Sequence, residues 1–125
     1  RRNPFGGYAY ETHEGTDFVG PYGTAIFATG DGKVVRAGYH GGHGNTVTIK
    51  HGYGYETLYA HMSKLAVESG TEIKRGDIVG YLGNTGRSSG PHLHYGIYYK
   101  GDAINPRTVM KLNHDMTVVE YWRLR

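Results

Sequence analysis

Alternating apolar and polar positions predict a chain built mostly from short β-strands. The clearest alternation runs from Asn45 to His51, where Val47 and Ile49 fall on one face and threonine and lysine side chains on the other. Glycine-containing turns separate this segment from two similar ones, Lys33 to Tyr39 and Tyr55 to His61. We expect the three segments to form an antiparallel meander.

The rest of the chain adds short strands and little helix. Further strands are predicted at Ala25 to Ala28, Thr71 to Ile73, Ile78 to Leu82 and His92 to Tyr99. Residues 83–90 are rich in glycine and serine and are expected to form a loop. Short helical turns are predicted at Ser63 to Leu65 and Thr108 to Leu112, and residues 113–125 are unassigned, with Thr117 to Trp122 as a candidate last strand. The predicted fold class is therefore mostly β.

Composition fits one small domain and restricts its metal chemistry. A length of 125 residues suits a single domain, residues 1–125, and 21 glycines with 12 tyrosines favour strands joined by tight turns. Cysteine is absent, so disulfides are excluded and a metal site must use histidine, carboxylate or water. No run of about 18 apolar residues occurs, so no membrane-spanning segment is predicted.

The net charge of +3 favours an acidic partner, and nucleic acid, anionic lipid and anionic cell-wall polymer all satisfy that condition. The basic residues are scattered, however, which is also typical of an ordinary solvated surface. They form no stripe and no nucleic-acid-binding motif, so a nucleic-acid partner is not expected.

Among the eight histidines, spacing singles out two groups. His13 and Asp17 are four residues apart, so their side chains leave the same face of an extended chain. His92 and His94 share a face of a predicted strand, about 6–7 Å apart. Each group taken alone leaves a simple alternative open, such as a pair of half-buried histidines with satisfied hydrogen bonds. His61 ends a predicted strand and, taken alone, is interpreted as a surface histidine.

Two histidines and one carboxylate suffice for a catalytic zinc site, in which three protein ligands leave a fourth position open to water. Such a site also needs a proton acceptor and a group that stabilises the developing oxyanion. The HExxH motif is absent, so its glutamate base is missing and spare histidines would take that part. His40, His43 and His114 lie in or near predicted loops and are interpreted as surface residues.

Three motifs occur in a fixed order: His13-x-Gly15-x-Asp17, Tyr59-Ala60-His61 and Gly90-Pro91-His92-Leu93-His94. In this combination the chain resembles the lysostaphin/LytM-type zinc endopeptidases over about residues 4–109. The resemblance implies a small antiparallel β-sheet domain with a groove walled by loops. It also implies a substrate class, the peptide bonds of peptidoglycan cross-links or bridges.

The resemblance further implies individual roles. His13, Asp17 and His94 are expected to bind Zn²⁺. His61 and His92 are expected to be catalytic, acting on the attacking water and on the tetrahedral intermediate. The family's place of action implies an extracytoplasmic location, with an export signal upstream of this chain.

An alternative function is a non-catalytic envelope module. Such a module would activate cell-wall amidases, as some relatives that have lost zinc ligands do, or would scaffold an envelope complex. All five expected site residues are present here. The complete set favours an active peptidase. The tail 113–125, which contains Tyr121 and Trp122, is a candidate contact for a regulatory domain or an envelope partner.

Overall fold

The computed structural model describes residues 8–12, 15–86 and 90–104. These residues form β-strands joined by turns, with one short 3₁₀ helix, η1 (Gly41–His43). No helix within the described ranges is long and apolar enough to cross a membrane. The strands are β1 (Tyr8–Thr12), β2 (Gly15–Val19), β3 (Ala25–Phe27), β4 (Gly32–Tyr39), β5 (Asn45–Gly52), β6 (Tyr55–Met62), β7 (Lys64–Leu65), β8 (Glu72–Ile73), β9 (Ile78–Tyr81), β10 (His92–Tyr99) and β11 (Asp102–Ile104).

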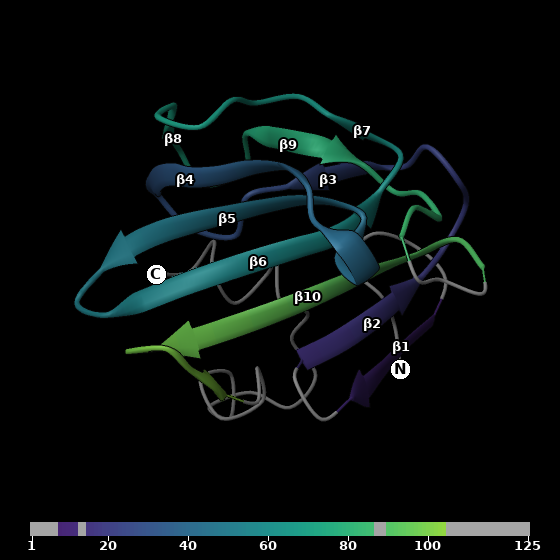
Figure 1. Ribbon diagram of the computed structural model, residues 1–125, viewed down its shortest axis with the longest axis horizontal. Coiled ribbons are helices and arrows are strands. Elements are labelled where there is room, and N and C mark those ends of the chain that lie inside the picture. The colour runs from purple at the N-terminus through teal and green to yellow at the C-terminus, as the bar shows by residue number, and fades with distance from the viewer. Residues whose placement is uncertain (1–7, 13–14, 87–89, 105–125) are drawn as a thin grey trace.

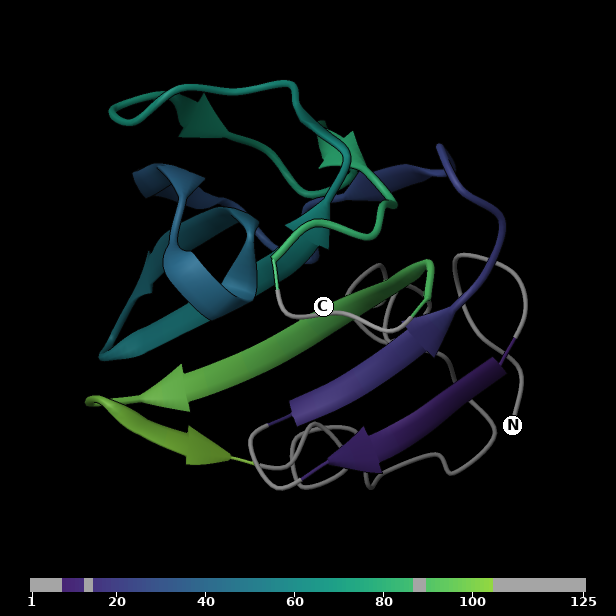
Figure 2. The same ribbon diagram turned by 45° about the vertical axis from the view of Figure 1, so that its right-hand side comes forward.

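The described strands form two antiparallel sheets (Figure 1). The larger sheet has the order β1-β2-β10-β6-β5-β4-β8, and β11 also pairs with β10. The smaller sheet has the order β3-β9-β7 and lies above β10, β2 and β1 of the larger sheet in both views (Figures 1 and 2). β10 is therefore a central strand, although it comes late in the chain, with β2 on one side and β6 on the other.

The hydrophobic core joins the two sheets. It takes Ile26 and Val79 from the smaller sheet and packs them in one cluster with Val47, Tyr59 and Leu93 of the larger sheet, all of which are fully buried. Burying a side chain of this size contributes roughly 1.5–3 kcal/mol relative to leaving it exposed. The core thus fixes the smaller sheet against one face of the larger one.

Along β10, residues that face the hydrophobic core alternate with the two histidines, which leave the opposite face of the strand. Leu93, Tyr95 and Ile97 are at most 1% exposed and belong to the core. His92 and His94 occupy the intervening positions, so their side chains leave the opposite face of the strand, as the period of two requires. The buried residues of β10 therefore anchor the strand that carries the two histidines.

A chain of buried hydroxyl groups ties β6 to β10 inside the core. The hydroxyl of Thr57 donates to the Tyr59 hydroxyl oxygen at 2.9 Å, and the Thr29 hydroxyl lies 3.1 Å from Tyr59 Oη and 2.8 Å from Tyr95 Oη. Burial raises the pKa of Tyr59, which keeps the phenol neutral and able to donate. Each buried hydroxyl thus has a partner, which avoids the cost of an unsatisfied polar group.

The structure confirms most of the strand predictions. The meander is β4-β5-β6, and the mostly β, antiparallel class is confirmed. Val47 and Ile49 do share the core face, but Thr46 and Thr48 on the other face are also buried. The chain therefore buries both faces of β5, which alternation alone did not predict.

One prediction was wrong, and three strands were missed. Residues Ser63 to Leu65 do not form a helical turn, because Lys64 and Leu65 pair with Tyr81 and Gly80 as β7. Three residues are too few to nucleate a helix, whereas a strand partner supplies hydrogen bonds at once. β1, β2 and β11 were not predicted. The predicted helix at Thr108 to Leu112, the candidate strand at Thr117 to Trp122 and the tail 113–125 lie outside the described residues.

Candidate active site

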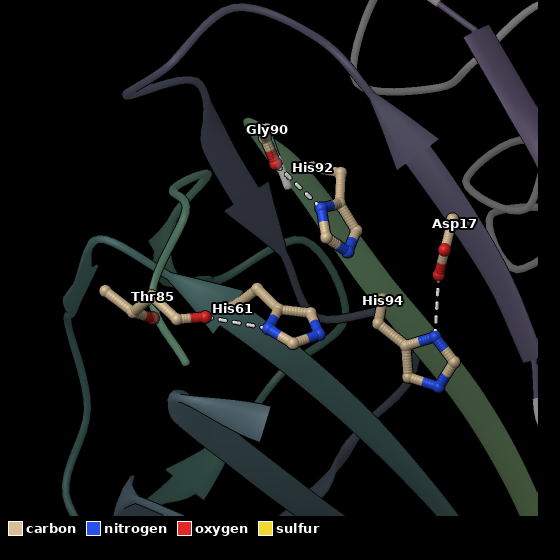
Figure 3. Close-up of polar contacts among 6 residues, drawn as sticks. All are labelled: Asp17, His61, Thr85, Gly90, His92 and His94. Atoms are coloured by element: carbon tan, nitrogen blue, oxygen red, sulfur yellow. Dashed lines mark hydrogen bonds and ion pairs between the residues drawn. The ribbon is translucent and has the colours of Figure 1, made fainter. Parts of the chain in front are cut away.

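The register of β2 against β10 brings a carboxylate to a histidine. Asp17 lies directly opposite His94 in this antiparallel pair, although the two residues are 77 positions apart. His94 Nδ1 lies 2.7 Å from Asp17 Oδ1, the distance of a charge-assisted hydrogen bond (Figure 3). The side chains are only 12% and 16% exposed, so water screens their interaction weakly.

Gly15 allows β2 to approach β10 this closely. A methyl group at its Cα would collide with the carbonyl oxygen of Tyr95 and lie 3.1 Å from Cα of Gly96. Both of these groups are backbone atoms of β10, so no side chain can move aside to make room. Gly15 stands two positions before Asp17, so a side chain at this position would push β2 away from β10 next to the Asp17–His94 pair.

Gly15→Ala is expected to lower the free energy of unfolding by about 1–3 kcal/mol, the usual cost of forcing extra volume into a packed site. Urea unfolding monitored by circular dichroism measures this effect. Gly38→Ala is the matched control, because Gly38 is also a strand glycine but has no atom within 4 Å of the added methyl group. Equal stability of the two variants would contradict the close approach of β2 to β10.

His92 lies on the same face of β10 as His94. Its Nδ1 lies 2.8 Å from the carbonyl oxygen of Gly90, and since a carbonyl only accepts, Nδ1 carries the proton. In the neutral ring Nε2 is then the accepting nitrogen. The ring centroid lies 4.6 Å from that of His61, so the imidazoles of β10 and β6 are in contact (Figure 3).

A β-bulge directs His61 to this face. The pairing of β5 with β6 shifts register between Asn45 and Val47, so that β6 has an extra residue in the stretch Ala60–His61. Tyr59 points into the core, and regular alternation would send His61 there too. Instead His61 has a φ of 65°, in the left-handed region, and its ring joins His92 and His94 (Figure 3).

Thr85 and Asn45 hold this irregular backbone in place. His61 Nδ1 donates to the Thr85 carbonyl oxygen at 2.8 Å, and the Thr85 hydroxyl donates to the Met62 carbonyl oxygen at 2.6 Å. The Asn45 amide group donates to carbonyl oxygens of Met62 and Ser63, and the backbone N–H of Asn45 donates to the Thr85 hydroxyl. The segment around Thr85 thus fixes both the position of His61 and its tautomer, in which Nε2 accepts.

The electrostatics keep His61 neutral. Burial lowers the pKa of this imidazole, the hydrogen bond to Thr85 opposes that shift, and the neighbouring His92, His94 and His43 lower the pKa further. The side chain is 7% exposed. A neutral imidazole with Nε2 as acceptor is able to take a proton or to bind a metal ion.

Four of the five predicted site residues come together: Asp17, His61, His92 and His94. His13 lies outside the described residues. Within the described ranges, no group of three histidine, cysteine or acidic side chains forms a metal site, so the structure supplies Asp17 and His94 as a pair only. The roles of all five residues remain predictions.

His43 is close to the site, although its sequence context marked it only as a surface residue. Its ring centroid lies 6.2 Å from that of His94 and 6.4 Å from that of His61. The side chain is exposed, as predicted. No local spacing connects His43 with the other histidines, because the fold of the β4–β5 turn alone brings it there.

Comparison with known proteins gives a consistent match. The model of a family described as peptidase family M23 matches residues 11–106. Peptidoglycan DD-endopeptidase ShyA of Vibrio cholerae is 46% identical over 104 residues, which cover 83% of this chain and 24% of ShyA. The chain spans about a quarter of the length of the curated relatives it matches.

Two solved structures extend this similarity to the fold. A zinc-containing peptidase from Vibrio cholerae is 40% identical with a TM-score of 0.71, and the match covers 74% of this chain and 28% of that one. The catalytic domain of lysostaphin from Staphylococcus simulans is 33% identical with a TM-score of 0.74, and the match covers 84% of this chain and 90% of that domain.

Proposed function

The chain belongs to peptidase family M23, and on this premise we propose that it is a zinc-dependent endopeptidase that hydrolyses peptide cross-links or bridges of bacterial peptidoglycan. The observation that carries the proposal is the convergence of an Asp17–His94 pair with the adjacent imidazoles of His61 and His92 on one face of the larger sheet. Relatives named as peptidoglycan DD-endopeptidases support the substrate class.

The side chains of Asp17 and His94 are suitable zinc ligands. Imidazole nitrogen and carboxylate oxygen are ligands that zinc prefers, and Nδ1 of His94 and Oδ1 of Asp17 already face each other across the strand pair. We assign His13 as the third protein ligand, by its place in the His13-x-Gly15-x-Asp17 motif. When bound, zinc supplies Lewis acidity, which polarises a peptide carbonyl and makes water more acidic.

His61 and His92 would perform the proton transfers. Backbone carbonyls hold the Nδ1 proton of each ring, so Nε2 is the nitrogen that can accept a proton from the attacking water. Once protonated, the same Nε2–H can donate a hydrogen bond to the developing oxyanion or a proton to the leaving amine. The contact between the two rings lets them act on neighbouring atoms of one peptide bond.

The location and the partners follow from the substrate. A peptidoglycan substrate places the domain outside the cytoplasm, and the net charge of +3 suits an anionic wall.

The alternative function is a non-catalytic envelope module that activates amidases or scaffolds a complex. The tail 113–125 is the proposed contact for a regulatory domain or an envelope partner.

Digestion of purified peptidoglycan by the zinc-loaded chain tests the proposal. Mass spectrometry of the released fragments is expected to show cleaved cross-links or bridges and to identify the bond. A chelator should stop the release, and added zinc should restore it. Binding to the wall without any cleavage would favour the non-catalytic module.

A further inference from the structure

We propose that His43 is a substrate-binding residue of this site, which hydrogen-bonds the main chain of the wall peptide within about two residues of the scissile bond. The proposal rests on the proposed peptidase function for the identity of the ligand. It assigns a role to a histidine that lies outside all three sequence motifs.

The turn that carries His43 is rigid. The backbone N–H of His40 donates to the Gly44 carbonyl oxygen at 2.8 Å, and the N–H of His43 donates to the His40 carbonyl oxygen at 2.9 Å. Gly44 also packs backbone against backbone on Thr85, where an added methyl group would collide with the Thr85 carbonyl group. The His43 backbone is thus fixed to the same segment that orients His61.

The nitrogens of the His43 ring, by contrast, have no hydrogen-bond partner among the described residues. Its backbone makes hydrogen bonds, but no hydrogen bond of the described part of the chain involves either ring nitrogen. The side chain is exposed, so it does not contribute to the core. A polar ring on a rigid backbone, with its nitrogens available to a ligand, is preorganised for binding, since little freedom is lost when a ligand docks.

The distances from the His43 ring to His94 and His61 determine which part of a bound peptide His43 can reach. The His43 ring lies 6.2 Å from that of His94, nearly parallel to it at 8°, and 6.4 Å from that of His61. Two residues of extended peptide span roughly 6.6–7 Å. A peptide whose scissile carbonyl lies at His61 and His94 therefore has a neighbouring main-chain group within reach of His43.

Removing the His43 side chain should weaken substrate binding and leave turnover nearly unchanged. His43→Ala is expected to raise KM for a defined cross-linked muropeptide about 5- to 10-fold, with kcat within about 2-fold of wild type and zinc content unchanged, as for a contact that is equal in the ground and transition states. His43→Asn, which keeps a hydrogen-bonding group, should restore most of the affinity. His43→Phe, which keeps only a flat ring, should not.

His40→Ala is the matched control, because His40 is an exposed histidine of the same turn and makes no ring contact with the described site residues. Its KM should stay at the wild-type value. A wild-type KM for His43→Ala would overturn the proposal. Loss of zinc from His43→Ala, or a fall in kcat at constant KM, would overturn it too, by showing a metal or catalytic role instead.

Calorimetric titration of the same muropeptide into His61→Ala and His61→Ala/His43→Ala separates the proposal from the proposed function. A 5- to 10-fold weaker Kd for the double variant supports binding by His43 even if the wild-type chain cleaves nothing. Equal Kd values for the two variants refute it, whatever the wild-type chain cleaves.

Discussion

Replacing His94 with alanine is expected to abolish zinc binding and to lower peptidoglycan cleavage by at least about 10³-fold, since Lewis-acid stabilisation of a transition state is worth several kcal/mol. His94 contributes the nitrogen that faces Asp17, and no other described side chain makes a hydrogen bond with that carboxylate. Zinc content after dialysis and the rate of fragment release measure the two effects. Excess zinc should raise the Tm of the wild-type chain but not that of His94→Ala.

Asp17→Asn is the companion variant. The asparagine side-chain oxygen can still accept the hydrogen bond from His94 Nδ1, so the packing of β2 on β10 should survive while the anionic ligand is lost. We expect a Tm near that of the metal-free wild type, together with loss of zinc and activity. Wild-type zinc content in either variant would show that the metal binds elsewhere.

Replacing His61 with alanine is expected to leave zinc in place and to lower kcat by about 10²-fold or more, the usual contribution of a general acid–base or oxyanion group. The imidazole contacts His92 but takes no part in the Asp17–His94 pair. Zinc content and kcat, measured on the same preparation, separate the two roles. If His61→Ala lost zinc, the residue would be a ligand and its assignment as a catalytic residue would be wrong.

The backbone at His61 requires a second variant. Its φ of 65° lies in the left-handed region, which costs a residue with a Cβ about 1 kcal/mol and which asparagine tolerates best among residues other than glycine. His61→Asn therefore preserves the bulge while removing the imidazole. It should match His61→Ala in kcat and have a higher Tm than His61→Ala. Full activity in His61→Asn would exclude proton transfer by His61.

Local sequence was sufficient for most of the fold. Alternation located the β4-β5-β6 meander and β10, because the period of two is a property of each strand by itself. It missed β2, which contains Gly15 and Asp17, both weak strand formers. That strand is stabilised by pairing with β1 on one side and β10 on the other, and these partners lie at opposite ends of the chain.

Some features of the candidate site were also predictable from local sequence, and others were not. The shared face of His92 and His94 follows from their spacing and was predicted from it. The reorientation of His61 was not predictable, since it requires an extra residue in β6 relative to β5 and the support of Thr85, 24 positions later. Regular alternation would have placed His61 in the core beside Tyr59.

The sequence by itself determined the mostly β architecture, the exclusion of cysteine ligands and the motifs that match the M23 family. Only the tertiary structure decided that Asp17 lies opposite His94, that a bulge brings His61 to His92, and that His43 lies beside both elements of the site. The physical reason is that a side chain's face depends on neighbours in sequence. Register, bulges and the docking of turns depend instead on hydrogen bonds and close backbone contacts between segments far apart in the chain.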